Sequence, residues 1–292
     1  LEQLKSLLKI PTVTSWTGID LIASDDPLYC GRQGSVGDRA GNFTVQNADL
    51  VLVLGSRLNI RQVSYNWKNF AKNAFIAQVD IDLAELNKPT IQPHLTIHSD
   101  LKFFLQVFNS LFIEEITKDS WLSWCKARVE RYPVVQDRQI NSEKINPYHF
   151  VHELFKHFNA NEVIACADGT ACVVPNQVAI IQKGQRLFTN SGDASMGYEL
   201  PAAIGAAFAR PGQRIICIAG DGSIQMNIQE LQTIIHHQLP IKIFVINNSG
   251  YLSIKQSQQS FFNAEYMGST FGGGVSSTAL THLADVYGFE MN

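Results

Sequence analysis

The chain has 292 residues, of which 45% are hydrophobic and 17% are charged, and its formal net charge is −3 at pH 7. The hydrophobic share is large enough for sizeable cores, which excludes disorder as the main state. The charge balance excludes the basic surface of a typical nucleic-acid-binding protein. No apolar run approaches the roughly 20 residues of a membrane-spanning helix, so we expect no membrane partner. The five cysteines are odd in number and lack metal-site spacing, which indicates a reducing cytoplasm.

The first half of the chain alternates short apolar runs with amphipathic stretches, a pattern that predicts βαβ units and a parallel sheet. Continuous apolar runs are typical of strands buried on both faces, and we predict strands at 48–55, 74–82 and 94–100. Helical spacing follows at 101–112. The more charged segment after it is expected to form a helix that Pro133 terminates, because proline lacks the backbone donor and clashes with the preceding turn.

The second half repeats this alternation, starting with a helix that has Pro147 near its beginning. Strands are predicted at 162–167, 186–190, 214–220 and 241–247. We therefore predict the α/β fold class, with two doubly wound, three-layer domains built on parallel sheets of the Rossmann or flavodoxin type. The expected boundaries are 1–115 for the first domain, 116–145 for a linker helix and connector, and 146–292 for the second domain.

Both ends of the sequence lie within or beside helical patterns. The chain begins at Leu1, without a methionine, and stops at Asn292 just after the helix-like stretch THLADVYGF. We therefore expect a fragment of a longer polypeptide, truncated at its N-terminus in the first domain and at its C-terminus in the second.

Short polar loops rich in small residues follow the four predicted strands of the second half. In an open α/β sheet, ligands bind outside the carboxyl ends of the strands, so these loops form the candidate binding site. Glycine at such positions lets a ligand approach the backbone and leaves peptide N–H groups available as donors. The four loops are Asp168–Thr170, Ser191–Gly197, Gly220–Ser223 and Asn247–Gly250.

Asp221 and Asn248 are the strongest metal-ligand candidates in these loops. They are 27 residues apart, which is one strand–helix–strand crossover, so we expect parallel strands whose carboxyl ends share one edge. Carboxylate and carboxamide oxygens suit Mg²⁺ or Ca²⁺, and Mg²⁺ commonly adds phosphate oxygens and water. The pattern predicts a metal-bridged phosphate or diphosphate site, with the amides of Gly222 and Ser223 at a helix N-terminus. The alternative is two ordinary turns, which the shared spacing after apolar strands disfavours.

The segment GDGSIQMNIQELQTIIHHQLPIKIFVINN, from Gly220 to Asn248, resembles the cofactor-binding motif of thiamine diphosphate enzymes, in which GDG is followed at a distance by NN. The stretches NSGDASMGYELPAAIGAAFARPGQRIICIAGDGS and GNFTVQNADLVLVLGSRLNIR look like the acetolactate synthase branch of that family. The resemblance covers essentially the whole chain. It implies the family's central domain, which is FAD-binding-like, followed by most of its thiamine diphosphate- and Mg²⁺-binding domain.

The family's roles can be carried over to positions in this sequence. The resemblance implies Mg²⁺ ligation by Asp221, by the Asn248 side chain and by the backbone carbonyl of Gly250. Met196 is expected to sit under the middle of the cofactor and hold its two rings in a bent V shape; the alternative is a methionine that fills a gap in the core. The implied cofactor-binding residues are Gly169, Thr170, Ser195, Met196, Gly220, Asp221, Gly222, Ser223, Asn248, Gly250 and Tyr251.

The resemblance implies a transferase or lyase that decarboxylates a 2-keto acid such as pyruvate and transfers the acyl-anion equivalent to a second carbonyl compound. Family members build their active sites between subunits, so we expect a homodimer or tetramer in the cytoplasm. The family's catalytic glutamate lies in an N-terminal domain, so we expect this chain alone to be inactive. Two alternatives stay open: a 2-keto acid decarboxylase or oxidase of the same fold, and a non-catalytic nucleotide-binding module.

Two positions depart from the acetolactate synthase pattern. The tryptophan that shapes the acceptor pocket shortly after NN aligns with Ser257, and a nearby methionine aligns with Ser253. Both changes remove bulk and apolar surface from the expected substrate pocket. A larger or more polar acceptor, such as a keto sugar, therefore fits the sequence at least as well as the acceptors of branched-chain amino-acid synthesis.

In acetolactate synthases the central domain binds FAD, and its GARFDDR-like motif appears here as GSRLNIR at 55–61. Arg57 and Arg61 keep the charges that suit a pyrophosphate, whereas the two acids between them are lost. Asp80, after its strand, is the expected partner of a ribose hydroxyl. A flavin site and a vestigial nucleotide fold both stay open. The glycine-rich stretch 31–41 is not GxGxxG and no strand clearly leads into it, so we interpret it as a loop.

Overall fold

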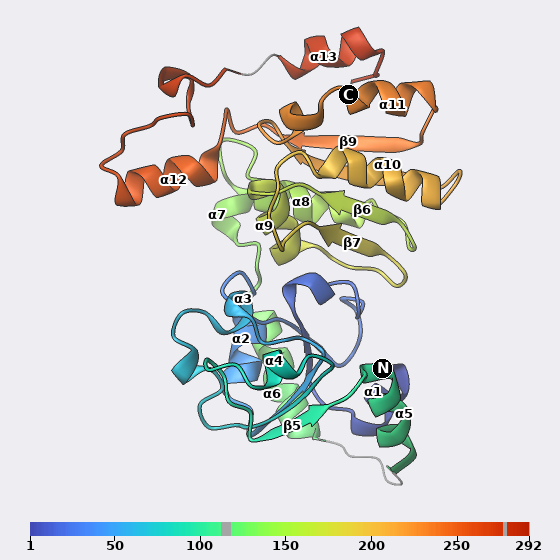
Figure 1. Ribbon diagram of the computed structural model, residues 1–292, viewed down its shortest axis with the longest axis vertical. Helices are drawn as coiled ribbons and strands as arrows, with labels where there is room; N and C mark the ends of the chain where they lie inside the picture. The colour runs from blue at the N-terminus through green and yellow to red at the C-terminus, as the bar shows by residue number, and fades with distance from the viewer. Residues whose placement is uncertain (112–117, 277–278, 292) are drawn as a thin grey trace. The chain divides into compact units, whose positions relative to one another are not determined.

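The computed structural model describes residues 1–111, 118–276 and 279–291. The chain forms two compact units, Leu1–Gln136 and Asp137–Asn292, in which helices and parallel strands alternate (Figure 1). The predicted α/β class with parallel sheets is confirmed. The expected domain junction between residues 115 and 116 lies outside the described residues. Among the helices that are described, none combines the length and the apolar character needed to cross a membrane.

The first unit contains two separate parallel sheets. One pairs β1 (Thr12–Thr14) with β2 (Tyr29–Arg32), and the other has the order β3 (Leu50–Leu54), β4 (Phe75–Asp80) and β5 (Leu95–His98). The helices of this unit are α1 (Glu2–Leu8), α2 (Arg39–Gln46), α3 (Ile60–Val63), α4 (Leu83–Leu86), α5 (Leu101–Leu111) and α6 (Asp119–Arg131). Helix α6 ends two residues before Pro133, as predicted.

The larger sheet of this unit follows the predicted apolar runs. Strands β3 and β4 pair in register from Leu50 opposite Phe75 to Leu54 opposite Val79. Val53 and Ile76 belong to a buried cluster with Val45 of α2, so the helix that follows the glycine-rich stretch covers part of this sheet. The alternation of apolar runs and amphipathic stretches therefore produced the expected strand–helix layering in this part of the unit.

The interpretation of residues 31–41 as a loop with no strand before it was wrong. Strand β2 leads directly into this stretch with all four of its residues buried, and α2 begins inside it at Arg39. The Asp38 carboxylate caps α2 by accepting a hydrogen bond from the N–H of Gly41 (2.6 Å), and its other oxygen accepts from the N–H of Arg32 in β2 (2.7 Å). Strand β2 was missed in the sequence because its four residues, YCGR, include a glycine and a charged residue and so do not form an apolar run.

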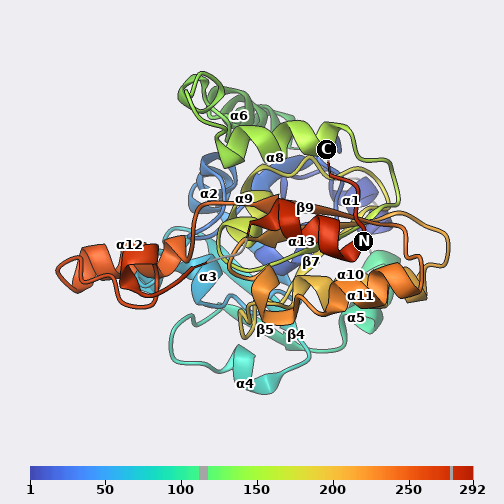
Figure 2. The ribbon, with the colours of Figure 1, turned by 90° about the horizontal axis from the view of Figure 1, so that it is seen from above.

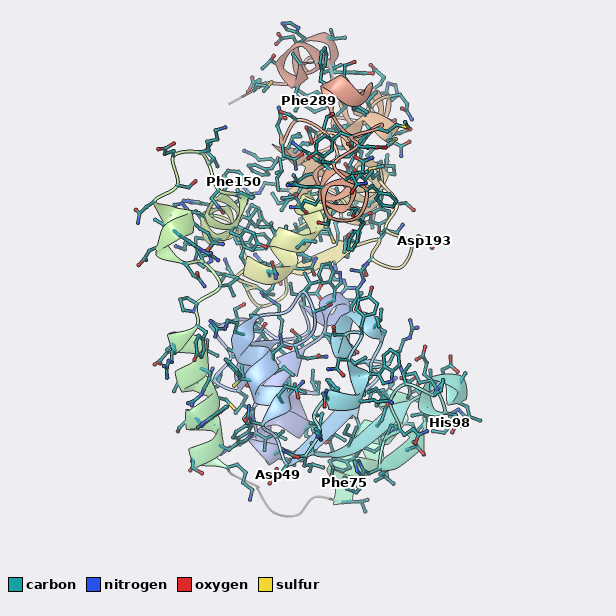
Figure 3. The ribbon with its side chains drawn as sticks, turned by 90° about the vertical axis from the view of Figure 1, so that its left-hand side faces the viewer. Asp49, Phe75, His98, Phe150, Asp193 and Phe289 are labelled. Atoms are coloured by element: carbon teal, nitrogen blue, oxygen red, sulfur yellow. The ribbon has the colours of Figure 1, made fainter. Side chains whose placement is uncertain are left out.

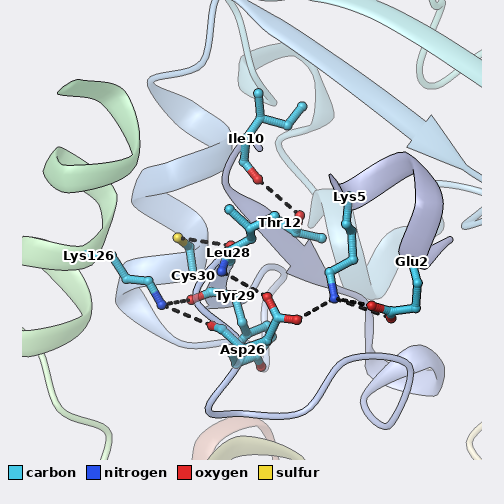
Figure 4. A network of polar contacts seen from close by, with 9 residues as sticks. All are labelled: Glu2, Lys5, Ile10, Thr12, Asp26, Leu28, Tyr29, Cys30 and Lys126. Carbon is cyan, nitrogen blue, oxygen red and sulfur yellow. Dashed lines mark hydrogen bonds and ion pairs between the residues drawn. The ribbon is translucent and has the colours of Figure 1, made fainter. Parts of the chain in front are cut away.

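A polar network joins the N-terminal helix of the first unit to its last helix (Figure 4). Lys5 of α1 pairs with Asp26 and, at 3.2 Å, with Glu2. Burial alone would lower the pKa of Lys5, but the hydrogen bonds that its ammonium group donates to Asp26 and Glu2 raise it above its usual value. Lys126 of α6 donates to the backbone carbonyls of Asp26 (3.2 Å) and Tyr29 (2.9 Å). The segment before β2 is therefore held from two sides.

The second unit contains one four-stranded parallel sheet. Its order is β7 (Arg186–Thr189), β6 (Val163–Cys166), β8 (Ile215–Gly220) and β9 (Ile241–Ile246). The helices are α7 (Asp137–Ile140), α8 (Pro147–Lys156), α9 (Thr170–Val178), α10 (Glu199–Ala209), α11 (Glu230–His236), α12 (Leu252–Phe261) and α13 (Leu280–Tyr287).

Helices cover both faces of this sheet, with α8 and α9 on one side and α10 and α11 on the other (Figure 2). Cys217 of β8 packs in the cluster formed with α10 and α11, whereas its neighbours Ile216 and Ile218 point to the opposite face. All three are at most 1% exposed. Burial on both faces explains why the central strands appear in the sequence as unbroken apolar runs.

The strand order reverses direction between β6 and β8. From β6 the chain moves outward to β7 and then returns past β6 to β8 and β9. In open α/β sheets, ligands bind at such a switch point, outside the carboxyl ends of the two strands. The loops after β6 and β8, at Asp168 and Asp221, are therefore at the position that the topology favours for a ligand.

Two phenylalanines of α8 provide a matched test of this core. Phe155 is fully buried, whereas Phe150 is 38% exposed on the outer side of the helix (Figure 3). Replacing Phe155 with alanine is expected to lower the free energy of unfolding by about 3–5 kcal/mol, because a large cavity remains. Phe150→Ala should cost less than about 1 kcal/mol. Urea unfolding followed by circular dichroism measures both, and equal losses would contradict the described core.

Candidate functional site

The loops after β6, β8 and β9 meet at one edge of the second sheet. Cys166 is paired with Ile218, and the N–H of Ala167 continues the ladder to the Ile218 carbonyl (2.8 Å). On the other side of β8, the N–H of Asp221 donates to the Ile246 carbonyl (3.2 Å). Backbone hydrogen bonds therefore carry all three strands to the same edge, and the residues just after them face a common region.

Asp221 and Asn248 are both brought to this edge. The buried Asp221 carboxylate accepts a hydrogen bond from the N–H of Gly250 (2.9 Å), which fixes the loop after β9 against the loop after β8. The Asn248 amide group donates to the Thr170 hydroxyl at 3.4 Å, which joins the loop after β9 to the start of α9. Predicted ligand residues from three different loops are therefore linked by direct side-chain contacts.

The donor set at this edge fits a hard divalent cation. The amide oxygen of Asn248 is buried and has no hydrogen-bond partner among the described residues. A buried acceptor without a donor is costly, and a cation would relieve that cost. Carboxylate, carboxamide and backbone carbonyl oxygens are the ligands that Mg²⁺ and Ca²⁺ prefer. The described ranges contain no group of three or more His, Cys, Asp and Glu side chains that could hold a metal ion.

Glycines leave the backbone of this edge accessible. Gly169 has φ +67° and directly precedes α9, which begins at Thr170. At Gly222, a Cβ would lie 2.4 Å from the Tyr251 ring, so the ring packs directly against the peptide of the loop after β8. Gly220, the last residue of β8, has no close neighbour other than Ser223. The positions of Gly169 and Gly220 are therefore open, whereas the Tyr251 ring lies against Gly222.

The loop after β7 approaches the same region through Gly197. The Gly197 N–H donates to the Ser223 hydroxyl (2.8 Å), which belongs to the loop after β8. Ser195 is exposed and Met196 is 40% exposed, so Met196 does not fill a gap in the hydrophobic core. Asp193 marks the outer part of this loop in Figure 3. The Met196 side chain is therefore exposed, and the next residue, Gly197, is held in place by its bond to Ser223.

Glu199 is a residue of this region that sequence reasoning missed. It is the first residue of α10 and fully buried, and its Oε2 accepts a hydrogen bond from the Ser223 hydroxyl (2.9 Å). Burial raises the pKa of the Glu199 carboxyl above its usual value, and the nearby Asp168 adds to the effect. Its only signal in the sequence is an acid at the start of the small-residue stretch LPAAIGAAFA, where a glutamate ordinarily indicates a helix N-terminus exposed to solvent.

The two serines assigned to a substrate pocket lie on α12. Ser253 Oγ is 3.8 Å from the position that a Cβ on Gly169 would occupy, so Ser253 adjoins the loop after β6. Ser257 is one turn further along the helix, and its hydroxyl donates to the Ser253 carbonyl (3.2 Å). Both serines are exposed. Ser253 is therefore the nearer of the two to the shared edge.

The residues considered for FAD lie in the first unit and already have protein partners. Arg57 pairs with Glu85 (2.7 Å), and the Arg61 guanidinium stacks 5.3 Å from the centre of the Trp16 ring. The Asp80 side chain accepts from the Asp82 N–H, while its other oxygen is buried without a partner among the described residues. Each arginine therefore has a protein partner, and Asp80 Oδ2 is buried without one among the described residues.

Two family models match the chain. The central domain of thiamine pyrophosphate enzymes matches residues 1–108, and their C-terminal, thiamine pyrophosphate-binding domain matches residues 168–291. The second range contains the loops that meet at the sheet edge. The two matches occupy most of the chain, one in each compact unit.

Curated relatives point to one branch. The chain is 36% identical over 300 residues to an acetolactate synthase large subunit of Cyanidium caldarium, covering 99% of this chain and 49% of that protein. It is 32% identical over 299 residues to the large subunit of acetolactate synthase isozyme 1 of Escherichia coli, covering 99% of this chain and 50% of the relative. It is 31% identical to the large subunit of isozyme 2 of the same organism, and this match covers 92% of this chain and 48% of the relative. The chain spans about half the length of these relatives.

Gly250 and Gly192 provide a test of the loop geometry. Gly250 has φ +125°, and an added Cβ would lie 2.7 Å from the Ser269 carbonyl oxygen. Gly250→Ala is therefore expected to lower the free energy of unfolding by about 1–3 kcal/mol. Gly192 has no atom within 4 Å of an added Cβ, and Gly192→Ala should change stability by less than about 0.5 kcal/mol. Urea titration of both variants measures the difference, and a harmless Gly250→Ala would contradict the described loop.

Proposed function

This chain belongs to the thiamine pyrophosphate enzyme family, and we propose that it is part of an acetolactate synthase-like carboligase dependent on thiamine diphosphate and Mg²⁺. The enzyme decarboxylates a 2-keto acid, pyruvate in the first instance, and transfers the acyl-anion equivalent to a second carbonyl compound. The observation that carries the proposal is the buried, unpartnered Asn248 oxygen on a loop that is hydrogen-bonded to Asp221. Its chemistry and position suit a cation that bridges protein and diphosphate.

The proposed Mg²⁺ ligands are the Asp221 carboxylate, the Asn248 amide oxygen and the backbone carbonyl of Gly250. The Gly250 N–H already donates to Asp221, so the two residues approach each other without a metal. The Thr170 hydroxyl receives the amide hydrogen of Asn248, which directs the amide oxygen away from Thr170. Three protein ligands leave positions for diphosphate oxygens and water in an octahedral sphere.

The proposed diphosphate cradle consists of backbone groups in two loops. Gly169 and Thr170 begin α9, a nine-residue helix whose N-terminal peptides can donate to an anion. Gly222 and Ser223 follow Asp221 in the second loop. The remaining proposed contacts are Ser195, Gly220 and Tyr251, and the Tyr251 ring packs against Gly222.

When bound, thiamine diphosphate supplies the electron sink for the carbanion that forms as a 2-keto acid loses CO₂. The residues of this chain contribute binding and orientation. Met196 is proposed to contact the middle of the cofactor and hold its two rings in the bent shape, since it projects from the loop after β7 and is 40% exposed. Its neighbour Gly197 is fixed to Ser223, so the contact point is held at a constant distance from the diphosphate loop.

The acceptor is proposed to be bulkier or more polar than those of the acetolactate synthase relatives, with a keto sugar as the leading class. Ser253 adjoins Gly169, and Ser257 extends the same polar side of α12. Two small hydroxyl-bearing side chains leave room and offer hydrogen bonds to a polyhydroxylated acceptor. We also propose that the enzyme is a cytoplasmic homodimer or tetramer of the transferase or lyase class. FAD is proposed to bind at Asp80, Arg57 and Arg61.

Cofactor binding tests the metal site directly. The 292-residue chain is titrated calorimetrically with thiamine diphosphate at saturating Mg²⁺. Asp221→Ala and Asn248→Ala are each expected to raise the Kd by about 100-fold or more, because each removes a metal ligand. Asp285→Ala, an exposed carboxylate on α13, is the control and should leave the Kd unchanged. No heat from the unaltered chain would contradict the proposal and favour a non-catalytic nucleotide-binding module.

Product analysis tests the reaction. A full-length enzyme that contains this segment is supplied with pyruvate, alone and together with a keto sugar, and we expect a branched keto alcohol. Acetaldehyde or acetyl phosphate as the main product would instead indicate a decarboxylase or oxidase. The 292-residue chain by itself is expected to bind the cofactor without turnover, since the family's catalytic glutamate belongs to its N-terminal domain. Measurable pyruvate consumption by this chain would contradict that expectation.

A further inference from the structure

Glu199 lies at one end of a series of buried hydrogen bonds in which Ser223 links two loops of the second unit. Its Oε2 accepts from the Ser223 hydroxyl (2.9 Å), and the Ser223 hydroxyl in turn accepts from the Gly197 N–H (2.8 Å). Ser223 belongs to the loop after β8, and Gly197 belongs to the loop after β7. The carboxyl group at the start of α10 therefore holds Ser223, and the Ser223 hydroxyl in turn holds the loop after β7.

We infer that Glu199 is a positioning residue of the proposed cofactor site, which fixes Ser223 and, through it, the Gly197 peptide next to Met196. This inference rests on the proposed function. It adds to it a residue outside the predicted ligand set that acts through Ser223 and Gly197. The distance between the loop after β8, assigned to the diphosphate, and the loop after β7, assigned to the middle of the cofactor, then stays the same with and without a ligand.

The direction of these two hydrogen bonds determines which group of Ser223 can bind a ligand. A serine hydroxyl has a single proton, and that of Ser223 is donated to Glu199. Its oxygen also accepts from Gly197, so the hydroxyl is engaged in both of its roles. Any bond from Ser223 to a diphosphate must therefore come from its peptide N–H. Glu199 thereby turns the Ser223 side chain toward the protein interior and leaves the backbone for the anion.

The cost of burying Glu199 supports a role beyond local packing. The residue is fully buried, and its Oε1 has no hydrogen-bond partner among the described residues. Burying an unpaired carboxylate is expensive, and burial shifts the pKa of Glu199 toward the neutral acid. An apolar residue would pack here at lower cost but would release Ser223.

The Gly197 peptide is also held from its other side. Asn227, in the short helical turn η3 (Ile224–Asn227), donates to the Gly197 carbonyl (2.9 Å). Gly197 has φ +81°, and a Cβ there would lie 2.6 Å from Met226 Cβ. Both polar groups of this residue are thus bonded to the segment after β8, and the close packing leaves no space for a side chain. Together with the bond from Ser223 to Glu199, these contacts hold the Gly197 peptide in one position.

The test compares two substitutions at position 199 by calorimetric titration of the 292-residue chain with thiamine diphosphate at saturating Mg²⁺. Glu199→Leu removes the acceptor for Ser223 and is expected to raise the Kd about tenfold, the effect of one lost hydrogen bond in the ordering of a site. Glu199→Gln keeps an acceptor oxygen without a charge and should restore the Kd to within about twofold of the unaltered chain. Rescue by glutamine separates positioning from filling of space.

A double-mutant comparison and a matched control complete the test. Ser223→Ala removes the other half of the bond, so combining it with Glu199→Leu should weaken binding no further than either change alone. Glu162 is the control, because it is also a buried glutamate, 4% exposed, but precedes β6 at the opposite edge of the sheet and pairs with Arg214. Glu162→Gln is expected to lower the melting temperature while leaving the Kd unchanged.

The outcomes distinguish this inference from the function on which it rests. Binding by the unaltered chain together with an unchanged Kd in Glu199→Leu would overturn the role of Glu199 and leave the proposed function standing. Tenfold weakening in Glu199→Gln as well would overturn the acceptor role. No binding by the unaltered chain would overturn both proposals. If Glu199→Leu does not fold, Ser223→Ala tests the same bond from its other end, and an unchanged Kd there overturns the inference.

Discussion

The parallel pairing of β8 with β9 is the constraint on which the candidate site depends. Because parallel strands end at the same edge, the residues after Gly220 and Ile246 emerge side by side, and the ladder continues from the Asp221 N–H to the Ile246 carbonyl. The bond from Gly250 to the Asp221 carboxylate then holds the second loop against the first. A carboxylate and a carboxamide distant in sequence are in this way fixed by backbone geometry before any ligand arrives.

Burial and strand topology determine which parts of this structure a sequence can predict. Strands such as β4 and β8 were predictable because burial on both faces demands unbroken apolar runs, and topology alone placed the polar residues after β8 and β9 at one edge as candidate site residues. Strand β2 was not, since its Arg32 is buried by contacts that involve the capping residue Asp38 six positions later. Glu199 was not, since its partner Ser223 lies 24 residues away and only the folded loops bring them together.

The arginines of the first unit show that a sequence does not reveal which charged side chains are free to bind a ligand. In the sequence, Arg57 and Arg61 appear as free charges near a strand end, which is the pattern of an anion site. In the fold, Glu85 lies 28 residues after Arg57 and pairs with it, and Trp16 lies far before Arg61 and stacks on it. Charge availability is a property of tertiary structure, because a long flexible side chain takes whichever partner the fold supplies. Motif arginines therefore carry less information than the backbone positions of glycines and strand ends.

The Lys126 contacts have a consequence for the order in which the first unit folds. Lys126 bonds to the Asp26 carbonyl across 100 residues of chain, and α6 also packs on α2, where Tyr132 contacts Phe43 and the Arg39 guanidinium. During synthesis, α1 and β2 leave the ribosome long before α6 is made. We therefore expect part of the interior around this segment to stay open to water until α6 packs against it. That delay makes closure by α6 a late step of folding with high contact order.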